Sequence, residues 1–287
     1  MSILSVKDLS YTYAKDSPFA TDALHHVEFS AERGEIIGII GPTGSGKSTL
    51  VQHLNGLIRT EPGHVFLDNC DIWEKPKEIT TVRHRVGLVF QYPEYQLFEE
   101  TAYADIAYGP RNIGLNEEEV RTRVAEAAET VGIAPELLDQ SPFDFSGGQK
   151  RRIAIAGVIA MRPDVLILDE PSAGLDPVGR RMVFDLIRRY REETGAAVMI
   201  VSHNMEDMAK VADKLLVLYQ GEVKCFDTPQ TVFSDRALLS SCHLEQPAGA
   251  RFADDLRHAG VNLPDGILTI PQLADALAPI LKGGRNG

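Results

Sequence analysis

Residues 41–49 read Gly41-Pro42-Thr43-Gly44-Ser45-Gly46-Lys47-Ser48-Thr49, a stretch that occurs once in this chain of 287 residues. It fits the pattern G-x-x-x-x-G-K-[ST], which forms a loop around phosphate groups between a strand and a helix. The apolar run from Glu35 to Ile40 before it predicts a buried strand, and residues 50–57 after it predict a helix. The strand–loop–helix context that the pattern requires is therefore present, and it indicates an α/β fold.

The residue types in this loop suit a polyphosphate. Glycines allow the backbone to curl until successive N–H groups point into one concavity beside the positive end of the following helix. Lys47 would reach the β- and γ-phosphates of a nucleotide, and the Ser48 hydroxyl would ligate Mg²⁺. Average residue usage gives such a match by chance about one time in a hundred in a chain of this length. We therefore expect the whole loop, Gly41 to Thr49, to bind the nucleotide.

Composition limits the class of partner. The formal net charge is −12 and the chain has no long basic run, whereas a protein that grips nucleic acid usually presents a basic face. We therefore expect no nucleic-acid partner. The three cysteines, Cys70, Cys225 and Cys242, lie far apart and form no C-x-x-C pair. This usage fits a reduced cytosolic protein without a disulfide framework or a zinc site.

The apolar segments are too short to cross a bilayer. The longest candidates, residues 153–161 and 196–201, fall well below the 18 or so residues that a spanning helix needs, and they predict a buried helix and a buried strand. Residues 1–9 lack the charged-then-apolar layout of a signal peptide. Any role at a membrane must therefore act through a partner.

Hydrophobic patterning predicts the order of the elements. Residues 3–13 and 24–30 alternate as half-exposed antiparallel strands do, and residues 64–67 and 86–90 predict further short strands. Continuous aliphatic runs at 165–168 and 198–201 are typical of parallel strands covered on both faces. Residues 215–219 and 222–226 flank Gln220-Gly221 and predict a hairpin.

Helical patterning takes over in the middle and at the end of the chain. It is clearest from Val120 to Val131, where Gly132 stands in the position that ends a helix. Residues 247–259 and 269–281 predict two short helices joined by a turn that contains glycine and proline. Thr269 and Gln272 match a capping box at the start of the second one.

Two carboxylates follow the apolar run Val165 to Leu168. Asp169 is placed to hold Mg²⁺, directly or through water, and Glu170 can polarise a water for attack on the γ-phosphate. A strand that ends in solvated acids is common, so this pair alone would indicate little. Downstream of a phosphate loop it predicts the catalytic edge of the site.

A second glycine-containing loop, Phe145-Ser146-Gly147-Gly148-Gln149, precedes a helical stretch from about Lys150 to Ala160. Ser146 is a natural N-cap, and two glycines leave backbone N–H groups bare at a helix start. Taken alone, the segment is more often an ordinary capped helix. Together with the phosphate loop it resembles the signature sequence of ATP-binding-cassette (ABC) ATPases, although leucine is commoner than Phe145 at its first position.

The resemblance implies roles for four more residues. Gln91 resembles the Q-loop glutamine that touches Mg²⁺ and water, and Asp176, in the run Ala173-Gly174-Leu175-Asp176, resembles the D-loop aspartate. His203 resembles the switch histidine that contacts the γ-phosphate. Tyr13 resembles the aromatic residue that stacks on adenine, with Tyr11 as the alternative. Glu170, His203 and Gln91 would then be catalytic, and Ser48, Gln91 and Asp169 would hold the metal.

The family also implies an architecture and an assembly. We expect a P-loop NTPase with a RecA-like core, an N-terminal antiparallel β subdomain, an inserted helical subdomain and a small C-terminal helical extension. The expected boundaries are 1–90 with 160–235 for the core, 91–159 for the helical signature subdomain and 236–287 for the extension. Because the signature loop of one ABC subunit completes the ATP site of another, Ser146, Gly147, Gly148 and Gln149 would act on a second ATPase subunit.

A narrower resemblance concerns the branch of the family. The stretches 90–101 and 108–112 around Gln91, with 52–57, 155–161 and 263–269, look like the ATPases of energy-coupling factor (ECF) transporters, closer to the second of their two ATPase kinds. That implies a peripheral protein on the cytoplasmic face of the cell membrane, bound to a transmembrane coupling protein and a substrate-binding membrane protein, and powering uptake of vitamins or metal ions. The alternatives are an ordinary ABC importer or exporter subunit and a soluble ABC ATPase outside transport.

Two regions carry further expectations from the ECF resemblance. A helical segment from Gln91 to about Arg111 would form the groove that receives a cytoplasmic helix of the coupling protein. The apolar residues Tyr92, Tyr95, Leu97 and Phe98 would serve either that groove or ordinary core packing. The C-terminal helices would either stabilise the ATPase dimer or cover an apolar edge.

Overall fold

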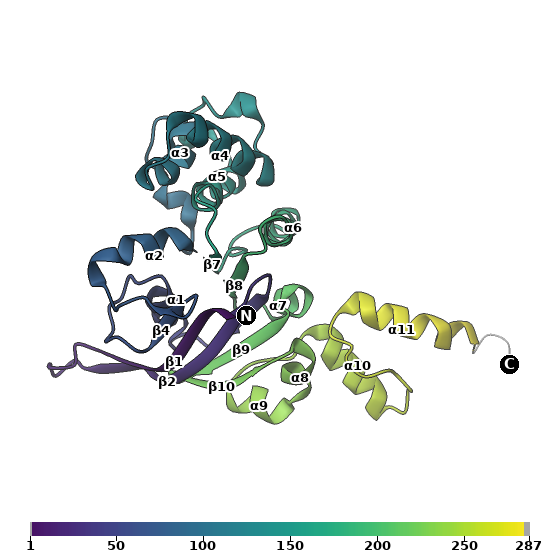
Figure 1. Ribbon diagram of the computed structural model, residues 1–287. Coiled ribbons are helices and arrows are strands. Elements are labelled where there is room, and N and C mark those ends of the chain that lie inside the picture. The colour runs from purple at the N-terminus through teal and green to yellow at the C-terminus, as the bar shows by residue number, and fades with distance from the viewer. Residues whose placement is uncertain (1, 284–287) are drawn as a thin grey trace.

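Two β-sheets form the centre of the protein in a computed structural model that describes residues 2–283 (Figure 1). The smaller sheet is antiparallel, in the order β2-β1-β4-β5. Its strands are β1 (Ser2–Tyr13), β2 (Thr21–Glu32), β4 (Val65–Leu67) and β5 (Cys70–Asp71). The larger sheet has the order β10-β9-β3-β8-β7-β6 and is parallel from β9 to β6. Its strands are β3 (Ile36–Ile40), β6 (Val86–Val89), β7 (Val165–Asp169), β8 (Ala197–Val201), β9 (Lys214–Tyr219) and β10 (Glu222–Asp227).

Apart from Asp169 at the end of β7, the central strands are apolar because they separate two cores. In β3, Ile36 and Ile40 face one hydrophobic cluster while Ile37 and Ile39 face the other. β7 alternates in the same way, so every one of these side chains leaves water. Parallel strands with both faces covered lose the polar–apolar alternation of half-exposed strands. The continuous apolar runs therefore correctly predicted parallel strands that are covered on both faces.

Helices cover both faces of the larger sheet and form a separate layer between β6 and β7 in the chain (Figure 1). They are α1 (Lys47–Leu54), α2 (Ile79–Arg85), α3 (Ala102–Asn112), α4 (Glu117–Thr130), α5 (Gly147–Ile159), α6 (Pro177–Thr194), α7 (Met205–Val211), α8 (Pro229–Ser234) and α9 (Arg236–Ser241), with 3₁₀ turns at Pro76–Glu78, Pro93–Gln96, Pro135–Leu137 and Pro142–Asp144. In Figure 1, α3, α4 and α5 lie together, away from α1 and β1.

Local signals predicted several element ends correctly. Gly132 follows α4 with φ of +68°, as a left-handed residue after a helix does. Gln220 and Gly221 also have positive φ, which is the two-residue turn that suits a β-hairpin. One expectation was too simple, since the segment from Gln91 to Arg111 is helical only in the short Pro93–Gln96 turn and from Ala102 onward.

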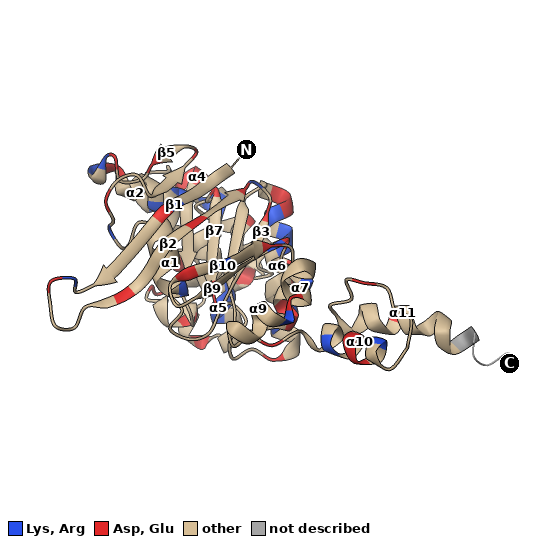
Figure 2. Cartoon of the chain, turned by 90° about the horizontal axis from the view of Figure 1, so that it is seen from below, with Lys and Arg blue, Asp and Glu red and all other residues tan. Residues whose placement is uncertain are grey.

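The C-terminal extension contains α10 (Ala248–His258) and α11 (Ile270–Gly283), and α11 points away from the rest of the molecule in Figures 1 and 2. The predicted capping box is present: Thr269 N–H donates to Gln272 Oε1 at 3.0 Å, and Gln272 N–H donates to Thr269 Oγ1 at 3.4 Å. A small core of its own, built on Ala253, Leu263, Ile267 and Leu273, holds α10 against α11. Residues 284–287 of the expected extension, and residue 1, lie outside the described residues.

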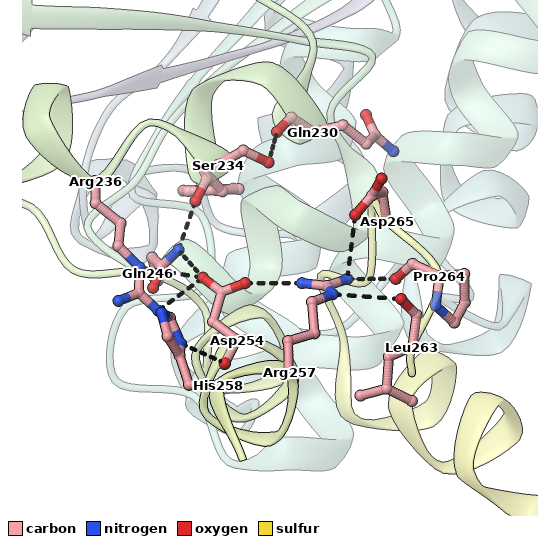
Figure 3. A network of polar contacts seen from close by, with 11 residues as sticks. Gln230, Ser234, Arg236, Gln246, Asp254, Arg257, His258, Leu263, Pro264 and Asp265 are labelled. Carbon is pink, nitrogen blue, oxygen red and sulfur yellow. Dashed lines mark hydrogen bonds and ion pairs between the residues drawn. The ribbon is translucent and has the colours of Figure 1, made fainter. Parts of the chain in front are cut away.

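Polar contacts around Asp254 fasten α10 to α9 and to the segment between them (Figure 3). The Asp254 carboxylate accepts from Arg236 of α9 at 2.9 Å, from Gln246 at 3.1 Å and from Arg257 of α10 at 2.7 Å. Burial alone would raise the pKa of Asp254, but these donors outweigh it and hold the pKa below its ordinary value. Within residues 2–283, no helix is both long enough and apolar enough to span a membrane.

Candidate functional site

The phosphate loop runs from the carboxyl end of β3 to α1 in a conformation that only glycine accepts at two points. Gly41 has φ of +155° and a Cβ there would lie 2.0 Å from the Leu218 carbonyl oxygen. Gly46 has φ of +104° and a Cβ would lie 2.5 Å from the Ala23 carbonyl oxygen. No side chain caps α1, whose N-cap residue is Gly46. The first-turn amides of α1 are thus left to bind an anion.

Lys47 and Ser45 lie inside this loop. Lys47 is 6% exposed, and its Nζ donates to the carbonyl oxygens of Gly41 at 2.7 Å and Pro42 at 2.8 Å. Burial lowers the pKa of Lys47, against the opposing influence of Glu170 and Asp169. The Ser45 hydroxyl is buried and has no hydrogen-bond partner within residues 2–283. Thr43 and Gly44 are exposed at the loop tip. Within the described residues, the loop therefore holds a buried cation bound to its own carbonyls and a buried hydroxyl without a partner.

Ser48 and Asp169 come together from the start of α1 and the end of β7. Ser48 Oγ donates to Asp169 Oδ2 at 3.3 Å. Burial raises the pKa of Asp169, while the Ser48 hydroxyl and the Lys47 charge oppose that rise. A hydroxyl and a carboxylate oxygen are ligands that Mg²⁺ prefers. This donor pair fits the metal that the sequence predicts.

Glu170 occupies a strained position one residue beyond β7. Its φ is +50°, and its N–H donates to the Val201 carbonyl oxygen at 3.0 Å. The carboxylate lies 3.3 Å from His203 Nε2 (Oε1 to Nε2) and is 13% exposed. Burial, followed by the charge of Asp169, raises the pKa of Glu170 to about 7. A carboxylate with a pKa near neutrality is suited to accept a proton.

His203 shares that environment from the end of β8. Burial, followed by the charge of Lys47, lowers the pKa of His203. The neutral ring is therefore favoured, and it can exchange hydrogen bonds with Glu170 and with a bound phosphate.

Tyr13 stands at the rim of the loop. Its hydroxyl and Thr49 Oγ1 are 3.2 Å apart, and its side chain is 39% exposed. Tyr11 packs edge-on against both Tyr13 and His53, with ring centroids 4.9 and 4.6 Å apart. Because Tyr11 is the ring packed between the two, Tyr13 is the better placed to stack on a base.

The signature loop is organised differently. Ser146 caps α5 in a complete capping box with Gln149, whose N–H donates to Ser146 Oγ at 3.4 Å. Ser146, Gly147 and Gly148 are all exposed. A Cβ at Gly147 or Gly148 would meet nothing within 4 Å, and neither residue has a positive φ. Nothing within residues 2–283 therefore requires glycine at these two positions.

The structure brings some predicted residues together and leaves others apart. Residues 41–49, Asp169, Glu170 and His203 converge at the carboxyl ends of β3, β7 and β8. Asp176 caps α6, where its Oδ1 accepts from Gly179 N–H at 2.7 Å. Gln91 is exposed after β6. The signature residues belong to the separate helical layer (Figure 1). Sequence reasoning missed the segment 243–251, which shares a cavity of about 420 Å³ with Gly41, Pro42 and His203.

Comparisons with known proteins agree with this geometry. A family model described as ABC transporter matches residues 24–173. The chain is 48% identical, over 99% of its own length and 99% of the relative's, to the energy-coupling factor transporter ATP-binding protein EcfA2 of Caldanaerobacter subterraneus. The chain is an ABC ATPase of the energy-coupling factor group. It is also 49% identical to the EcfA2 protein of Symbiobacterium thermophilum, over 97% of this chain and 96% of that one.

Solved structures of ABC proteins resemble this ABC ATPase in fold. Superposition on cbiO1 from Clostridium perfringens, described as part of the ABC transporter complex cbiONQ, gives a TM-score of 0.75 at 36% identity, over 88% of this chain and 99% of that one. The dimeric ATP-binding cassette MJ0796, in a post-hydrolysis state bound to ADP and Pi, gives 0.70 at 28% identity, over 79% and 98%. The expected fold class, the P-loop NTPase of the ABC type, is confirmed.

Proposed function

We propose that this chain binds and hydrolyses ATP as a subunit of an energy-coupling factor transporter and so powers uptake of vitamins or metal ions. The observation that carries the proposal is the convergence of Lys47, Ser48, Asp169, Glu170 and His203 on one phosphate loop. Near-full-length similarity to proteins named for such transporters supports this branch over an ordinary importer or a soluble ATPase.

Each residue has a defined task in this proposal. The backbone N–H groups of the phosphate loop, Pro42 excepted, and the Lys47 ammonium hold the β- and γ-phosphates, while Tyr13 stacks on adenine. Glu170 accepts a proton from the attacking water, and its raised pKa keeps it a competent base near neutral pH. His203 orients that carboxylate and contacts the γ-phosphate. Ser48, Asp169 and Gln91 would hold Mg²⁺, which would neutralise phosphate charge.

The complete site requires two ATPase subunits. Ser146, Gly147 and Gly148 are exposed and Gln149 is half-buried, which supports a role against a nucleotide held by the other subunit. Gly147 and Gly148 have no contact within residues 2–283 that excludes a Cβ, and without a side chain they leave room for a nucleotide of the other subunit to approach the backbone. Asp176, at the start of α6, would lie at the same interface. ATP binds the closed pair better than the open pair, and hydrolysis reverses that preference.

The segment after Gln91 is proposed to receive a membrane partner. Tyr95 is 84% exposed and Phe98 is 60% exposed, whereas Leu97 is buried, so the run divides between surface and core. Phe98 and Tyr108 border a cavity of about 310 Å³ against α5. A cytoplasmic helix of the transmembrane coupling protein would fit against this apolar surface, with a substrate-binding membrane protein attached to it. The ATPase would then lie on the cytoplasmic face of the membrane.

The domain boundaries follow from the same proposal. Residues 1–90 with 160–235 form the ATP-binding core, and residues 91–159 form the helical subdomain. Residues 236–287 stabilise the pair of ATPases. The exposed apolar side chains of Ile270, Ile280 and Leu281 on α11 support this role. Exposed apolar side chains on a projecting helix often mark a surface that a second protein covers.

Mass spectrometry of the intact complex, purified from its own membranes in detergent, tests this function. We expect two ATPase subunits, identical or homologous, together with integral-membrane proteins. A chain recovered without any integral-membrane partner would contradict the transport role. A chain recovered with a dedicated permease of another type would favour the ordinary ABC importer or exporter.

A further inference from the structure

Arg151 is a charged side chain that the proposed site does not use. It stands on the second turn of α5, five residues after Ser146, and is only 2% exposed. Arginine is almost never fully buried unless its charge is paired. The groups that pair with Arg151 therefore indicate its structural role.

The first partner is Glu94, in the 3₁₀ turn three residues after Gln91. Arg151 Nη2 donates to Glu94 Oε1 at 2.7 Å, and Arg151 Nε donates to Glu94 Oε2 at 3.0 Å. The pair is a two-pronged fork, which fixes direction as well as distance. Burial disfavours the Glu94 carboxylate, but the bonds from Arg151 outweigh it and hold the pKa of Glu94 below its ordinary value.

The second partner is the backbone that follows Glu170. Arg151 Nη1 donates to the Ala173 carbonyl oxygen at 2.6 Å and to the Pro171 carbonyl oxygen at 3.3 Å. The Ala173 N–H in turn donates to the Glu170 carbonyl oxygen at 3.1 Å, which closes a tight turn. This turn starts at the residue with φ of +50° and leads to Asp176. The turn is also tied to α7 through Ser172 Oγ, which donates to Asp207 Oδ2 at 3.3 Å.

We propose that Arg151 is a positioning residue that couples three segments: the 3₁₀ turn after Gln91, the turn that begins at Glu170, and the signature helix. The inference rests on the proposed function, because it assigns Glu170 as the base and the segment after Gln91 as the docking surface. A partner that displaces Glu94 moves the guanidinium, and the guanidinium carries the Glu170 turn and the start of α5 with it. One side chain thus links membrane docking to the catalytic turn of this chain's own ATP site and to the signature helix that completes the ATP site of the other subunit.

Lysine cannot take over this task. A guanidinium presents five donors in a fixed plane, and here four bonds in two directions use that plane. An ammonium on a flexible stem keeps the charge but reaches one of the two groups at a time. Arg151→Lys therefore separates the loss of coupling from the loss of charge.

The test uses the full-length chain in its membrane complex, reconstituted in lipid nanodiscs and supplied with MgATP. Arg151→Lys should lower kcat about tenfold or more and leave the KM for ATP within about twofold, because the base is misplaced while the phosphate loop is intact. Hydrogen exchange of the peptide covering residues 170–176 should accelerate by a similar factor. Glu94→Gln keeps the bonds to Pro171 and Ala173, so both changes should be smaller and in the same direction.

Arg162→Gln is the matched control, since Arg162 pairs with Glu126 at the surface, where both are about half exposed. It should change neither kcat nor the exchange of residues 170–176. If Arg151→Lys behaves like this control, or lowers only the melting temperature, the inference is wrong. If Arg151→Lys does not fold, parent-like kcat and exchange in Glu94→Gln overturn it equally.

The proposed function fails separately. If Glu170→Gln hydrolyses ATP as the parent complex does, the assignment of the base is wrong whatever Arg151 does. If Glu170→Gln is inactive and the Arg151 variants match the control, only the coupling role is lost. The exchange measurement does not depend on turnover and therefore distinguishes the two cases.

Discussion

The phosphate loop at residues 41–49 and the signature loop at residues 145–149 both place glycines at the start of a helix. They differ in the backbone conformation of those glycines, in the space around them and in the capping of the helix. In the first, Gly41 and Gly46 adopt positive φ and stand where a Cβ would collide with backbone. In the second, Gly147 and Gly148 have open space around them. The first helix starts without a side-chain cap, whereas Ser146 caps the second.

The difference indicates what each loop faces. The glycines of the phosphate loop are needed by the chain's own fold, and the loop encloses Lys47 and Ser45. Glycine near a helix start lowers helix stability relative to alanine when nothing local requires it. Gly147 and Gly148 meet no such need within residues 2–283, which agrees with the proposed site shared between two subunits. The following predictions test this contrast, from the largest effect to the smallest.

Glu170→Gln should separate ATP binding from ATP hydrolysis in the half of the site that the phosphate loop, Asp169, Glu170 and His203 form, here called the enclosed half. Loss of a general base lowers turnover by about 10²- to 10⁴-fold, while the amide still allows ATP to bind. Steady-state hydrolysis and size-exclusion chromatography with ATP measure the two effects. We expect a near-inactive protein that stays dimeric on ATP. Turnover equal to the parent's would remove Glu170 from the role of base.

Lys47→Ala should weaken nucleotide binding by the single chain. The ammonium is buried and supplies a charge-assisted contact to phosphate, so its loss should cost about tenfold to a hundredfold in affinity. Titration with a fluorescent ATP analogue measures it. An unchanged Kd would contradict the assignment of the phosphate loop.

Ser146→Arg should leave that single-chain affinity as it is and block closure of the pair. A long cation in place of a small exposed hydroxyl fills the space that the partner's nucleotide needs. We expect ATP-dependent dimerisation to require at least about tenfold more protein, measured by analytical ultracentrifugation. A variant that dimerises on ATP like the parent would rule out the composite site.

A pair of alanine substitutions compares the two loops directly. Gly46→Ala should destabilise the fold by about 2 kcal/mol, through positive φ and a clash with the Ala23 carbonyl. Gly148→Ala should leave the monomer unchanged or up to about 1 kcal/mol more stable, because alanine favours helix. Chemical denaturation measures both. Equal destabilisation by the two variants would remove the contrast between the loops.

The pH dependence of hydrolysis gives the smallest effect. Glu170 must be ionised to accept a proton, and its pKa lies at about 7, so activity should rise about fourfold from pH 6.5 to pH 8. The same raised pKa means that the folded state binds more protons than the unfolded chain, so this carboxylate's contribution to stability falls as pH rises from 4.5 to about 7. A flat rate profile from pH 6.5 to pH 8 would contradict a base with this pKa.

Sequence alone predicted most of the enclosed half. Residues 41–49, Asp169, Glu170 and His203 follow strands whose apolar runs are unmistakable, and parallel strands bring their carboxyl ends to one edge. The fold class followed from the same pattern, since the phosphate loop and the signature together resemble one family.

Other contacts could not be predicted, because they depend on three-dimensional approach between distant segments. Arg151 reads as one more polar residue after the signature, yet it meets Glu94 and Ala173 across gaps of 57 and 22 residues. The packing of Tyr92, Tyr95, Leu97 and Phe98 also stayed open, since a short irregular segment has no period that separates its buried side from its exposed side. Only Leu97 proved to be buried.

The backbone at Glu170 has a consequence for how this protein would change under selection. A non-glycine residue at φ of +50° costs about 1 kcal/mol, which glycine or asparagine would largely avoid. A library selected only for heat resistance should therefore enrich those two residues at position 170. A library selected for ATP turnover should restore glutamate there.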